Sequence, residues 1–284
     1  MKLKLSIIGC GRLGKVLAAL LLRTKRVCIQ DVLNLTYSSS KKAVAFIGQG
    51  NVCQTLRQLQ AADIYLIATP DDCIEFIAQQ LMLQRKLKQD DVIFHCSGLL
   101  SSESLNTVTR LGCYIASLHP LYSFSNPVVD IKKFKGTYCA FEGDKAALDR
   151  LLPLIKAIGG RLFKIEKKAK PLYHVASVLA SNYLVTLSAI AGDCYLKAGL
   201  DSELSVKLTQ QLMSQTLTKV RQLKPKKALT GPLERADINT LKKHLVVLNN
   251  FPELGGIYKS LGKATLGLTK HKKPLKTSLT ALLS

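Results

Sequence analysis

A glycine pattern near the start of the chain, SIIGCGRLGKVLAALL, constrains the fold more than any other segment. Gly9, Gly11 and Gly14 have the GxGxxG spacing, directly after a strand-like apolar run and directly before a run with helical periodicity. In this context the first glycine makes a tight turn, the second lets a pyrophosphate approach the backbone, and the third lets helix and strand pack closely. The segment therefore predicts a dinucleotide-binding βαβ unit in preference to a structural turn.

Short apolar runs alternate with helical patterns over the first part of the chain. Strands are predicted for LKLSIIG, VCIQDVLNLT, DIYLIATP, DVIFHCSG, CYIASLHP, TYCAFEG and RLFKIE. Helices are predicted for RLGKVLAALLLR, DCIEFIAQQLMLQ and DKAALDRLLPLIKAIGG. Because several strands are apolar on both faces, this order predicts an α/β domain with a doubly wound, mainly parallel Rossmann sheet.

The pattern changes after Glu166, where strand-like runs end and helical segments follow. We therefore predict two domains, a dinucleotide-binding Rossmann domain over residues 1–166 and an all-α substrate and dimerisation domain over residues 167–284. Helices are expected at residues 171–198, 202–223, 237–248, 253–263 and 275–283.

The chain is strongly basic, with 41 Lys and Arg against 19 Asp and Glu and a formal net charge of +22. Such a charge attracts anions but does not distinguish phosphates from carboxylates or nucleic acid, and it also fits an ordinary solvated surface. The chain has no Trp, 6% aromatic residues and no recognisable nucleic-acid motif. We therefore expect a small anionic substrate and no nucleic-acid partner.

The cysteines and histidines bear on compartment and metal binding. The eight cysteines show no CxxC or paired spacing, which is typical of reduced thiols. The N-terminus lacks the pattern of an export signal, so we expect a cytoplasmic protein. His244 and His271 have no ligand spacing to each other or to a Cys or carboxylate pair, and no metal site is predicted.

An uncharged run of eighteen residues extends from Val175 to Gly192. It is barely long enough for a membrane span and carries several Ser, Thr and Asn side chains, so it predicts a core helix rather than a span. His174, Ser177, Ser181 and Asn182 share one broad side of this helix. They fit either a hydrogen-bonded helix interface or the floor of an active site beside the cofactor.

Polar residues also follow several predicted strands, in the segments ATPDD, HCSG and SLHP. Ligands of open α/β sheets bind beyond the carboxyl ends of the strands. Ser97 and His119 therefore fit a polar site and a structural turn equally well. The predicted cofactor-binding residues are Gly9, Gly11, Arg12, Leu13, Gly14, Asn34, Thr36, Ser38, Ala68, Thr69 and Pro70.

The end of the second strand bears on the choice between NAD and NADP. Asp31 lies near the position where an acid would bind the ribose hydroxyls of NAD, but the apolar pattern continues past it. If the strand ends at NLTYSSSKK, the ribose faces Asn34, Thr36 and Ser38, which suits the 2′-phosphate of NADP. We expect NADP, with NAD as the alternative.

Five motifs together resemble one family: GCGRLG, HCSG, SLHPLYSF, YHVASVLASNYLVTL and ALTGPLERADINTLKKHL. They are similar to Rossmann-like proteins with a C-terminal domain of unknown function, which are related to pyrroline-5-carboxylate, ketopantoate and 6-phosphogluconate dehydrogenases. The segments IQDVLN and AFIGQG most resemble an alternative ketopantoate reductase branch. The chain departs from the family at Leu35, where an Arg is often found, and at Ala236, where Gly is favoured.

The resemblance implies a site on the first helix of the second domain. His174 corresponds to the lysine of ketopantoate reductases and Asn182 to one of their asparagines. The catalytic residues are then His174, Asn182, Ser97 and His119, with Ser97, His119, Asn182 and Arg235 as substrate contacts. Helical second domains in this superfamily commonly form dimers, which implies a homodimer.

The resemblance implies the NADPH-dependent reduction of a small 2-oxoacid, 2-dehydropantoate (ketopantoate) first, to give pantoate in pantothenate and coenzyme A biosynthesis. One alternative is a pyrroline-5-carboxylate-type imine or another keto acid. Another is a non-catalytic NADP-binding regulatory protein. Hydride addition to a ketone leaves negative charge on oxygen, and a histidine can supply the proton near neutral pH.

Overall fold

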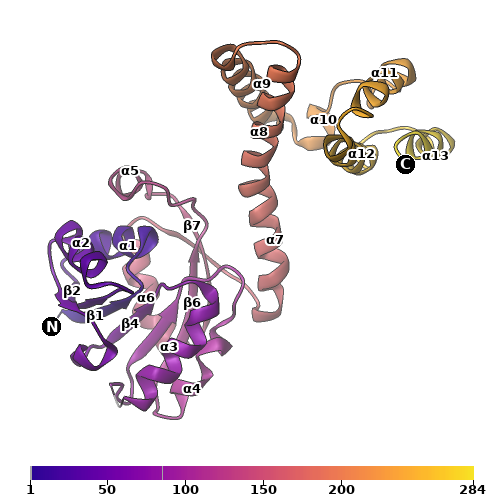
Figure 1. The fold of residues 1–284 in the computed structure, drawn as a ribbon. Helices are drawn as coiled ribbons and strands as arrows, with labels where there is room; N and C mark the ends of the chain where they lie inside the picture. The colour runs from indigo at the N-terminus through magenta and orange to yellow at the C-terminus, as the bar shows by residue number, and fades with distance from the viewer. Residues whose placement is uncertain (1, 85) are drawn as a thin grey trace. The chain divides into compact units, whose positions relative to one another are not determined.

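The computed structural model describes residues 2–84 and 86–284. They divide into two compact units, one up to Ser181 and one from Asn182 to Ser284. The first unit reaches further than the predicted domain boundary at residues 166–167, because it includes helix α7 (Lys170–Ala180), coloured pink in Figure 1. The change from strand-like to helical sequence after Glu166 therefore lies one helix before the division between the two units.

The first unit is built on one eight-stranded sheet with the order β3-β2-β1-β4-β5-β6-β7-β8. All neighbouring strands are parallel except β6 and β7, so the predicted mainly parallel Rossmann sheet is confirmed. The strands are β1 (Leu3–Ile8), β2 (Val27–Leu33), β3 (Asn51–Cys53), β4 (Ile64–Ile67), β5 (Val92–His95), β6 (Tyr114–Pro120), β7 (Tyr138–Gly143) and β8 (Arg161–Lys164).

Helices cover both faces of this sheet (Figure 1). They are α1 (Arg12–Arg23), α2 (Tyr37–Ile47), α3 (Asp71–Leu83), α4 (Asn106–Thr109), α5 (Pro127–Lys133) and α6 (Lys145–Ala157). Short 3-10 helices lie at Leu56–Gln58, Ser102–Leu105 and Lys167–Ala169. Side chains of α1, α2 and α6 pack on one face, and side chains of α3 and α4 pack on the other.

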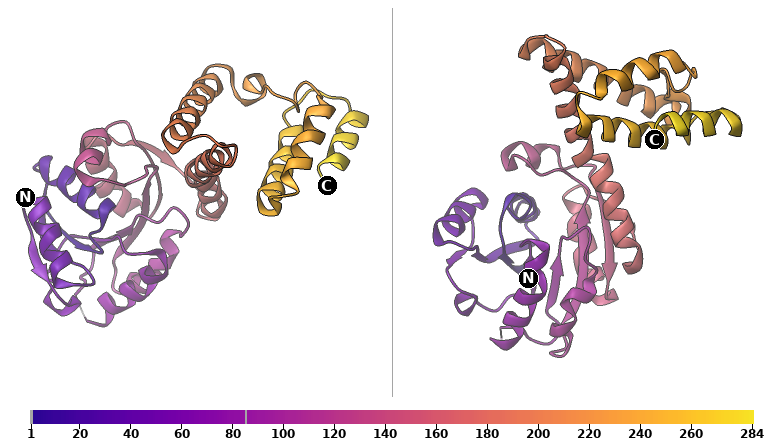
Figure 2. Two further views of the ribbon diagram at one scale, coloured as in Figure 1. Left: turned by 45° about the horizontal axis from the view of Figure 1, so that its top comes forward. Right: turned by 45° about the vertical axis from the view of Figure 1, so that its right-hand side comes forward.

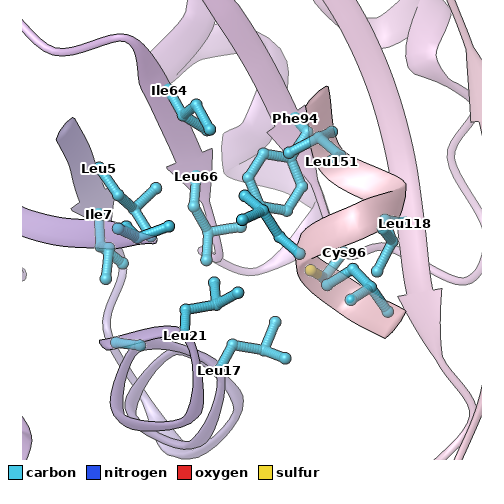
Figure 3. Close-up of a cluster of buried hydrophobic side chains, with 14 of the residues drawn as sticks. Leu5, Ile7, Leu17, Leu21, Ile64, Leu66, Phe94, Cys96, Leu118 and Leu151 are labelled. Atoms are coloured by element: carbon cyan, nitrogen blue, oxygen red, sulfur yellow. The ribbon is translucent and has the colours of Figure 1, made fainter. Parts of the chain in front are cut away.

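Two hydrophobic cores lie on the two sides of the sheet because successive residues of a strand point to opposite faces. In β4, Leu66 faces the core that includes Leu17 and Leu21 of α1, whereas Ile67 belongs to the core that includes Ile74 of α3. Figure 3 shows the first of these cores, with side chains of α1 opposite those of β1 and β4. These cores fix the strands whose carboxyl ends carry the polar residues.

The second unit is helical. It contains α8 (Asn182–Lys197), α9 (Ser202–Leu223), α10 (Pro225–Ala228), α11 (Ile238–Leu248), α12 (Pro252–Leu266) and α13 (Lys273–Leu282). Helices α11, α12 and α13 lie together in Figure 2 and share a core of four buried leucines, at positions 241, 266, 279 and 283. The predicted all-α second part is confirmed.

The uncharged run differs from its prediction in two ways. The helix is interrupted at Ser181 (φ −120°, ψ −69°), so α7 and α8 replace the single helix expected over residues 171–198. The prediction of a buried core helix is wrong for a single chain, since Val175, Leu179 and Val185 are each more than half exposed. Helices α7 and α8 have the apolar side chains that the sequence predicts, but no other described part of the chain buries these three residues.

By length and composition alone, the helical run Lys167–Lys197 could cross a membrane, and none of its apolar window is buried. One such helix is weak evidence for a span, because the same test is passed by helices that are not in membranes. Its first turns carry Lys170, whose side chain is buried against Ser97, after β5, and Ser117, in the middle of β6. At least this end of the run therefore packs on protein.

Ala236 has a left-handed backbone (φ 54°), so the replacement of the family's glycine is not a mild change. A Cβ in this conformation costs about 1 kcal/mol or slightly more. We expect Ala236→Gly to raise the free energy of unfolding by about 0.5–1 kcal/mol in denaturant titrations. Ala264→Gly, inside the regular helix α12, is the matched control and should lower it by about 1 kcal/mol. Destabilisation by both variants would contradict the strain at Ala236.

Candidate functional site

The glycine loop joins β1 to α1 at the carboxyl edge of the sheet. Gly9 has φ +84°, and a Cβ there would lie 2.6 Å from the Thr69 backbone nitrogen, so only glycine fits this turn. Gly14 is buried, and a Cβ there would meet Cys10 Sγ and the Gly9 carbonyl oxygen at 3.4 Å, which agrees with close helix–strand packing. The turn and packing roles predicted for these glycines match their geometry.

Gly11 is the open member of the loop. It is exposed, and the nearest atom that a Cβ would meet is the Gly9 carbonyl oxygen at 4.0 Å. It is also the N-cap of α1, whose first turn carries exposed Arg12 and no acidic residue. Free backbone N–H groups and positive charge at a helix N-terminus favour an anion such as a pyrophosphate.

Thr69 supplies a second sign of a ligand site beside the loop. Its Oγ1 atom is buried and has no hydrogen-bond partner among the residues that the structure describes, while its methyl carbon lies against Gly9. Leaving a buried hydroxyl unpaired costs about 1–3 kcal/mol. A dinucleotide seated on the glycine loop would offer polar atoms at this position, so the residues present fit such a cofactor.

The end of β2 differs in detail from the expected ribose contact. Strand β2 continues two residues past Asp31, whose buried carboxylate accepts hydrogen bonds from Asn51 and from the Gln60 backbone N–H. Asp31 is thus a structural residue. Thr36 caps helix α2 and Ser38 lies in its first turn, so this part of the predicted ribose segment is helical rather than extended.

The polar residues after β2 are nevertheless at the correct edge of the sheet. Asn34 follows the last residue of β2, and its side-chain amide donates to the Cys10 carbonyl oxygen in the glycine loop at 3.5 Å. Leu35 is fully exposed at the position where related proteins often have Arg. Lys41 and Lys42, also exposed, are the cations of α2.

Ser97, after β5, has every hydrogen-bonding position of its hydroxyl group occupied. Its Oγ donates to Asp71 Oδ2 at 2.6 Å and accepts from the backbone N–H groups of Leu99 and Leu100. Of the two interpretations of this residue, the side-chain contacts agree with the structural turn. Its predicted substrate contact stays a prediction.

His95, at the end of β5, is a neutral structural imidazole. Its Nδ1 accepts from the Ser97 N–H at 3.1 Å and its Nε2 lies 3.0 Å from the Ser101 carbonyl oxygen, so the ring proton is on Nε2. Burial lowers the pKa of His95 to about 4. The ring holds the turn that carries Ser97 and Gly98.

His119 and His174 meet above Gly98. A Cβ on Gly98 would lie 2.7 Å from His174 Cδ2 and 3.0 Å from both Cε1 and Nε2 of His119, so the missing side chain makes room for both rings. The ring centroids are 6.5 Å apart in an edge-to-face arrangement. Two predicted residues, one at the end of β6 and one on α7, are thus brought together at the carboxyl edge of the sheet.

Three participating residues were not singled out from the sequence. Tyr173 bonds His119, Asp71 bonds Ser97, and Lys170 is buried beneath them. Lys170 lies four residues before His174, a spacing that places both on one helix face. That spacing is the signal that could have identified it, although a lysine beside a predicted domain boundary is ordinarily exposed.

Asn182 and Arg235 belong to the second unit, and their predicted roles stay predictions. Asn182 is the exposed first residue of α8. Arg235 is exposed and directly precedes the left-handed Ala236, while Asp237 caps α11 by accepting from the Thr240 N–H. The residues that the structure brings together, Ser97, His119 and His174, all belong to the first unit.

The comparisons with known proteins agree with this architecture. Residues 1–120 match the Rossmann-like domain family, and residues 137–265 match a domain of unknown function (DUF2520). Among curated proteins, none matches this chain.

Solved structures resemble the chain over nearly its whole length. One, described as a candidate NADP oxidoreductase from Bacteroides fragilis, is 21% identical, with a TM-score of 0.78, and the match covers 94% of this chain and 98% of that one. A Thermotoga maritima protein is 23% identical, with a TM-score of 0.70 and coverage of 96% and 98%. Pyrroline carboxylate reductase of Plasmodium falciparum, with NADP bound, is 15% identical, with a TM-score of 0.58 and coverage of 99% and 98%. The chain therefore combines a Rossmann-like domain with a DUF2520 domain.

Proposed function

We propose that this protein is an NAD(P)-dependent oxidoreductase that reduces a small 2-oxoacid with NADPH. The observation that carries the proposal is the meeting of His119 and His174 at the same sheet edge as a dinucleotide-type glycine loop. The unpaired Thr69 hydroxyl beside Gly9 supports a ligand there. Proteins of similar fold are named as NADP oxidoreductase, pyrroline carboxylate reductase with NADP, and prephenate dehydrogenase with NAD+.

Each part of the site has a distinct task in this proposal. Gly9, Gly11 and the N-terminus of α1 hold the pyrophosphate, and bound NADPH would supply the hydride. His174 donates the proton that neutralises the developing alkoxide. Asn182 orients the carbonyl group, as the family resemblance implies. His119 and Arg235 are the proposed contacts of the substrate's polar groups. Ser97 would contact the substrate only by exchanging one of the present partners of its hydroxyl group, Asp71, Leu99 or Leu100.

NADPH is the expected form of the cofactor. The segment after β2 offers Asn34, Thr36 and Ser38, and α2 adds the exposed cations Lys41 and Lys42. The only acid near the expected position, Asp31, is committed to the Asn51 and Gln60 contacts. This chemistry favours a 2′-phosphate over a free ribose hydroxyl, although Leu35 removes one cation that related proteins use.

The proposed substrate is 2-dehydropantoate, reduced to pantoate for pantothenate and coenzyme A synthesis. Pyrroline-5-carboxylate-type imines and other keto acids need the same hydride acceptor and the same proton donor, so they are the main alternatives. A non-catalytic NADP-binding regulatory protein would keep the glycine loop but need no histidine pair. The basic net charge of +22 would attract any of these anionic substrates.

An NADPH-oxidation assay across 2-oxoacids and cyclic imines, with NADH in parallel, tests the proposal. We expect turnover with one or a few 2-oxoacids and faster turnover with NADPH than with NADH. Turnover with a cyclic imine alone would select the imine alternative. Saturable NADPH binding without turnover of any substrate would select the regulatory alternative and contradict the reductase.

We further propose a homodimer as the working form. Apolar side chains are exposed along α7, α8 and α9, with Leu172 at 76% and Val185 at 70% exposure. Surfaces of this kind, rimmed by polar residues, mark protein–protein interfaces. Sedimentation equilibrium should give twice the mass of 31.1 kDa. A monomer at micromolar concentration would contradict the dimer.

The free thiols support a proposal about the compartment. All eight cysteines are free, five of them buried. Free thiols of this number persist in a reducing compartment. We therefore propose a cytoplasmic location, which fractionation of cells expressing the tagged chain would test.

A further inference from the structure

Helix α7 points three side chains at the strand ends that form the site. Lys170, Tyr173 and His174 are at positions i, i+3 and i+4, which lie on one face of a helix. Lys170 is 1% exposed, and its Nζ donates to the Ser97 carbonyl oxygen at 2.9 Å and to Ser117 Oγ at 2.6 Å. Its ammonium group therefore ties α7 to the loop after β5 and to the middle of β6.

A lysine is almost never fully buried unless it is paired. Here, among residues 2–84 and 86–284, no carboxylate lies within 4.0 Å of Lys170 Nζ. Burial lowers the pKa of Lys170, and the more distant charges of Glu142 and Asp71 oppose that shift. An apolar residue at this position would avoid the desolvation cost of a buried ammonium group and could still pack α7 on the sheet. The buried charge therefore needs a further explanation.

Tyr173 fixes the orientation of His119. Its hydroxyl group lies 2.8 Å from His119 Nδ1. If the hydroxyl donates to Nδ1, a neutral His119 carries its proton on Nε2. The Cε1–Nε2 edge of the ring lies over Gly98, beside His174. That N–H group then faces the site.

The charged and titratable groups around His119 come from two elements. Lys170 and His174 approach from α7, and Asp71 approaches from the first turn of α3. The neighbouring strand β7 places the apolar Ala140 opposite His119, and Gly98 faces it after β5. Burial lowers the pKa of His119 to about 4, with Lys170 the next cause and His174 after it, while Asp71 opposes them.

We propose that Lys170 and Tyr173 are positioning residues that present His119 to the site as a neutral imidazole donating from Nε2–H. Lys170 does so through its buried charge, which disfavours a positive charge on the His119 ring, and Tyr173 does so through its hydrogen bond to Nδ1. His119 and His174 then have different tasks, since one stays neutral and donates a hydrogen bond while the other gives up a proton. We assign the carbonyl group of the substrate as the acceptor of this hydrogen bond, and that assignment rests on the proposed function. The tautomer and the protonation state of His119 do not depend on it.

Histidine NMR of the full chain, without cofactor or substrate, tests this proposal. His119 is assigned by comparison with a His119→Gln variant. We expect imidazole ¹⁵N shifts typical of the Nε2–H tautomer and no protonation of His119 between pH 8 and about pH 5. A protonation midpoint near the unperturbed value of about 6.5, or an Nδ1–H tautomer, would overturn the proposal. Because no turnover is measured, failure of the reductase hypothesis would leave this result unaffected.

Two variants separate charge from anchoring. Lys170→Met is similar in size but removes the charge, and it should raise the pKa of His119 by roughly one unit. Ser117→Ala removes the shorter hydrogen bond of Nζ but keeps the charge, and it should leave the His119 midpoint within a few tenths of a unit. Equal shifts in both variants would show that loosening of α7, not the charge, is responsible, and would contradict the proposal.

A third variant tests the hydrogen bond from Tyr173. Tyr173→Phe removes the hydroxyl group and keeps the ring, which packs edge-to-face against Phe163. We expect the ¹⁵N shifts of His119 to move towards a mixture of the two tautomers. Unchanged shifts would exclude Tyr173 as the residue that selects the tautomer.

Discussion

Replacing His174 by glutamine is expected to lower kcat for NADPH-dependent reduction by about 10²–10⁴-fold, the usual contribution of a positioned general acid. The imidazole lies at the carboxyl edge of the sheet, with Cδ2 beside Gly98 and its ring 6.5 Å from that of His119. Glutamine keeps a polar group of similar length but cannot donate a full proton. The measurement is the initial rate at saturating substrate, with the NADPH dissociation constant determined in parallel.

The matched control for this variant is His244→Gln. His244 is exposed and lies on α11 in the second unit, where its Nδ1 bonds the Tyr258 hydroxyl group at 2.8 Å. We expect its kcat to stay within about twofold of the unmodified chain. An unchanged kcat in the His174→Gln enzyme would contradict the role of His174 as the acid. The dissociation constant of NADPH should be the same in both proteins, which would show that a fall in kcat is not caused by weaker cofactor binding.

The glycine loop offers a pair of substitutions with different expected effects. Gly9→Ala combines a left-handed backbone with a Cβ 2.6 Å from the Thr69 nitrogen, and backbone atoms there cannot move aside cheaply. We expect a loss of about 2–4 kcal/mol in the free energy of unfolding, together with loss of cofactor binding. Gly11→Ala has open space at its Cβ, so its stability should change by less than about 0.5 kcal/mol. Denaturant titration distinguishes the two.

Gly256→Ala is the control for the pair. It lies inside α12, and a Cβ there would meet no atom within 4 Å. We expect it to stabilise the chain by up to about 1 kcal/mol and to leave cofactor binding unchanged. A Gly9→Ala chain as stable as the unmodified one would contradict the close approach of Gly9 to Thr69.

The Rossmann sheet was predictable because its signals are local. Strands such as β5 are apolar runs bounded by turn residues, and α1 begins and ends where its periodicity does. The longest helix that was missed is α2 (Tyr37–Ile47), and strand β3 (Asn51–Cys53) was missed as well. The shorter helices α4, α5 and α10 and the 3-10 helices were also not predicted. Strand β3 is too short to show alternation, and the serine-rich start of α2 resembles a loop until the cap at Thr36 is known.

The site was only partly predictable, since its residues come from distant segments. Strand-end reasoning identified His119, and helix periodicity identified His174. The burial of Lys170 depends on the meeting of α7 with two strands, which no local pattern encodes, and lysine is ordinarily exposed. The same limit applies to the exposed face of α7 and α8, where an apolar pattern predicts burial but does not say which chain covers it.

The central claim is that a dinucleotide binds at the glycine loop, and an equilibrium titration of NADPH fluorescence tests it most directly. The unmodified chain and Gly256→Ala should bind NADPH saturably with the same dissociation constant. Gly11→Ala should fold normally but bind at least about 10-fold more weakly, because its methyl group occupies the approach of the pyrophosphate. Absence of saturable binding by the unmodified chain, or equal affinity in all three proteins, would contradict the account.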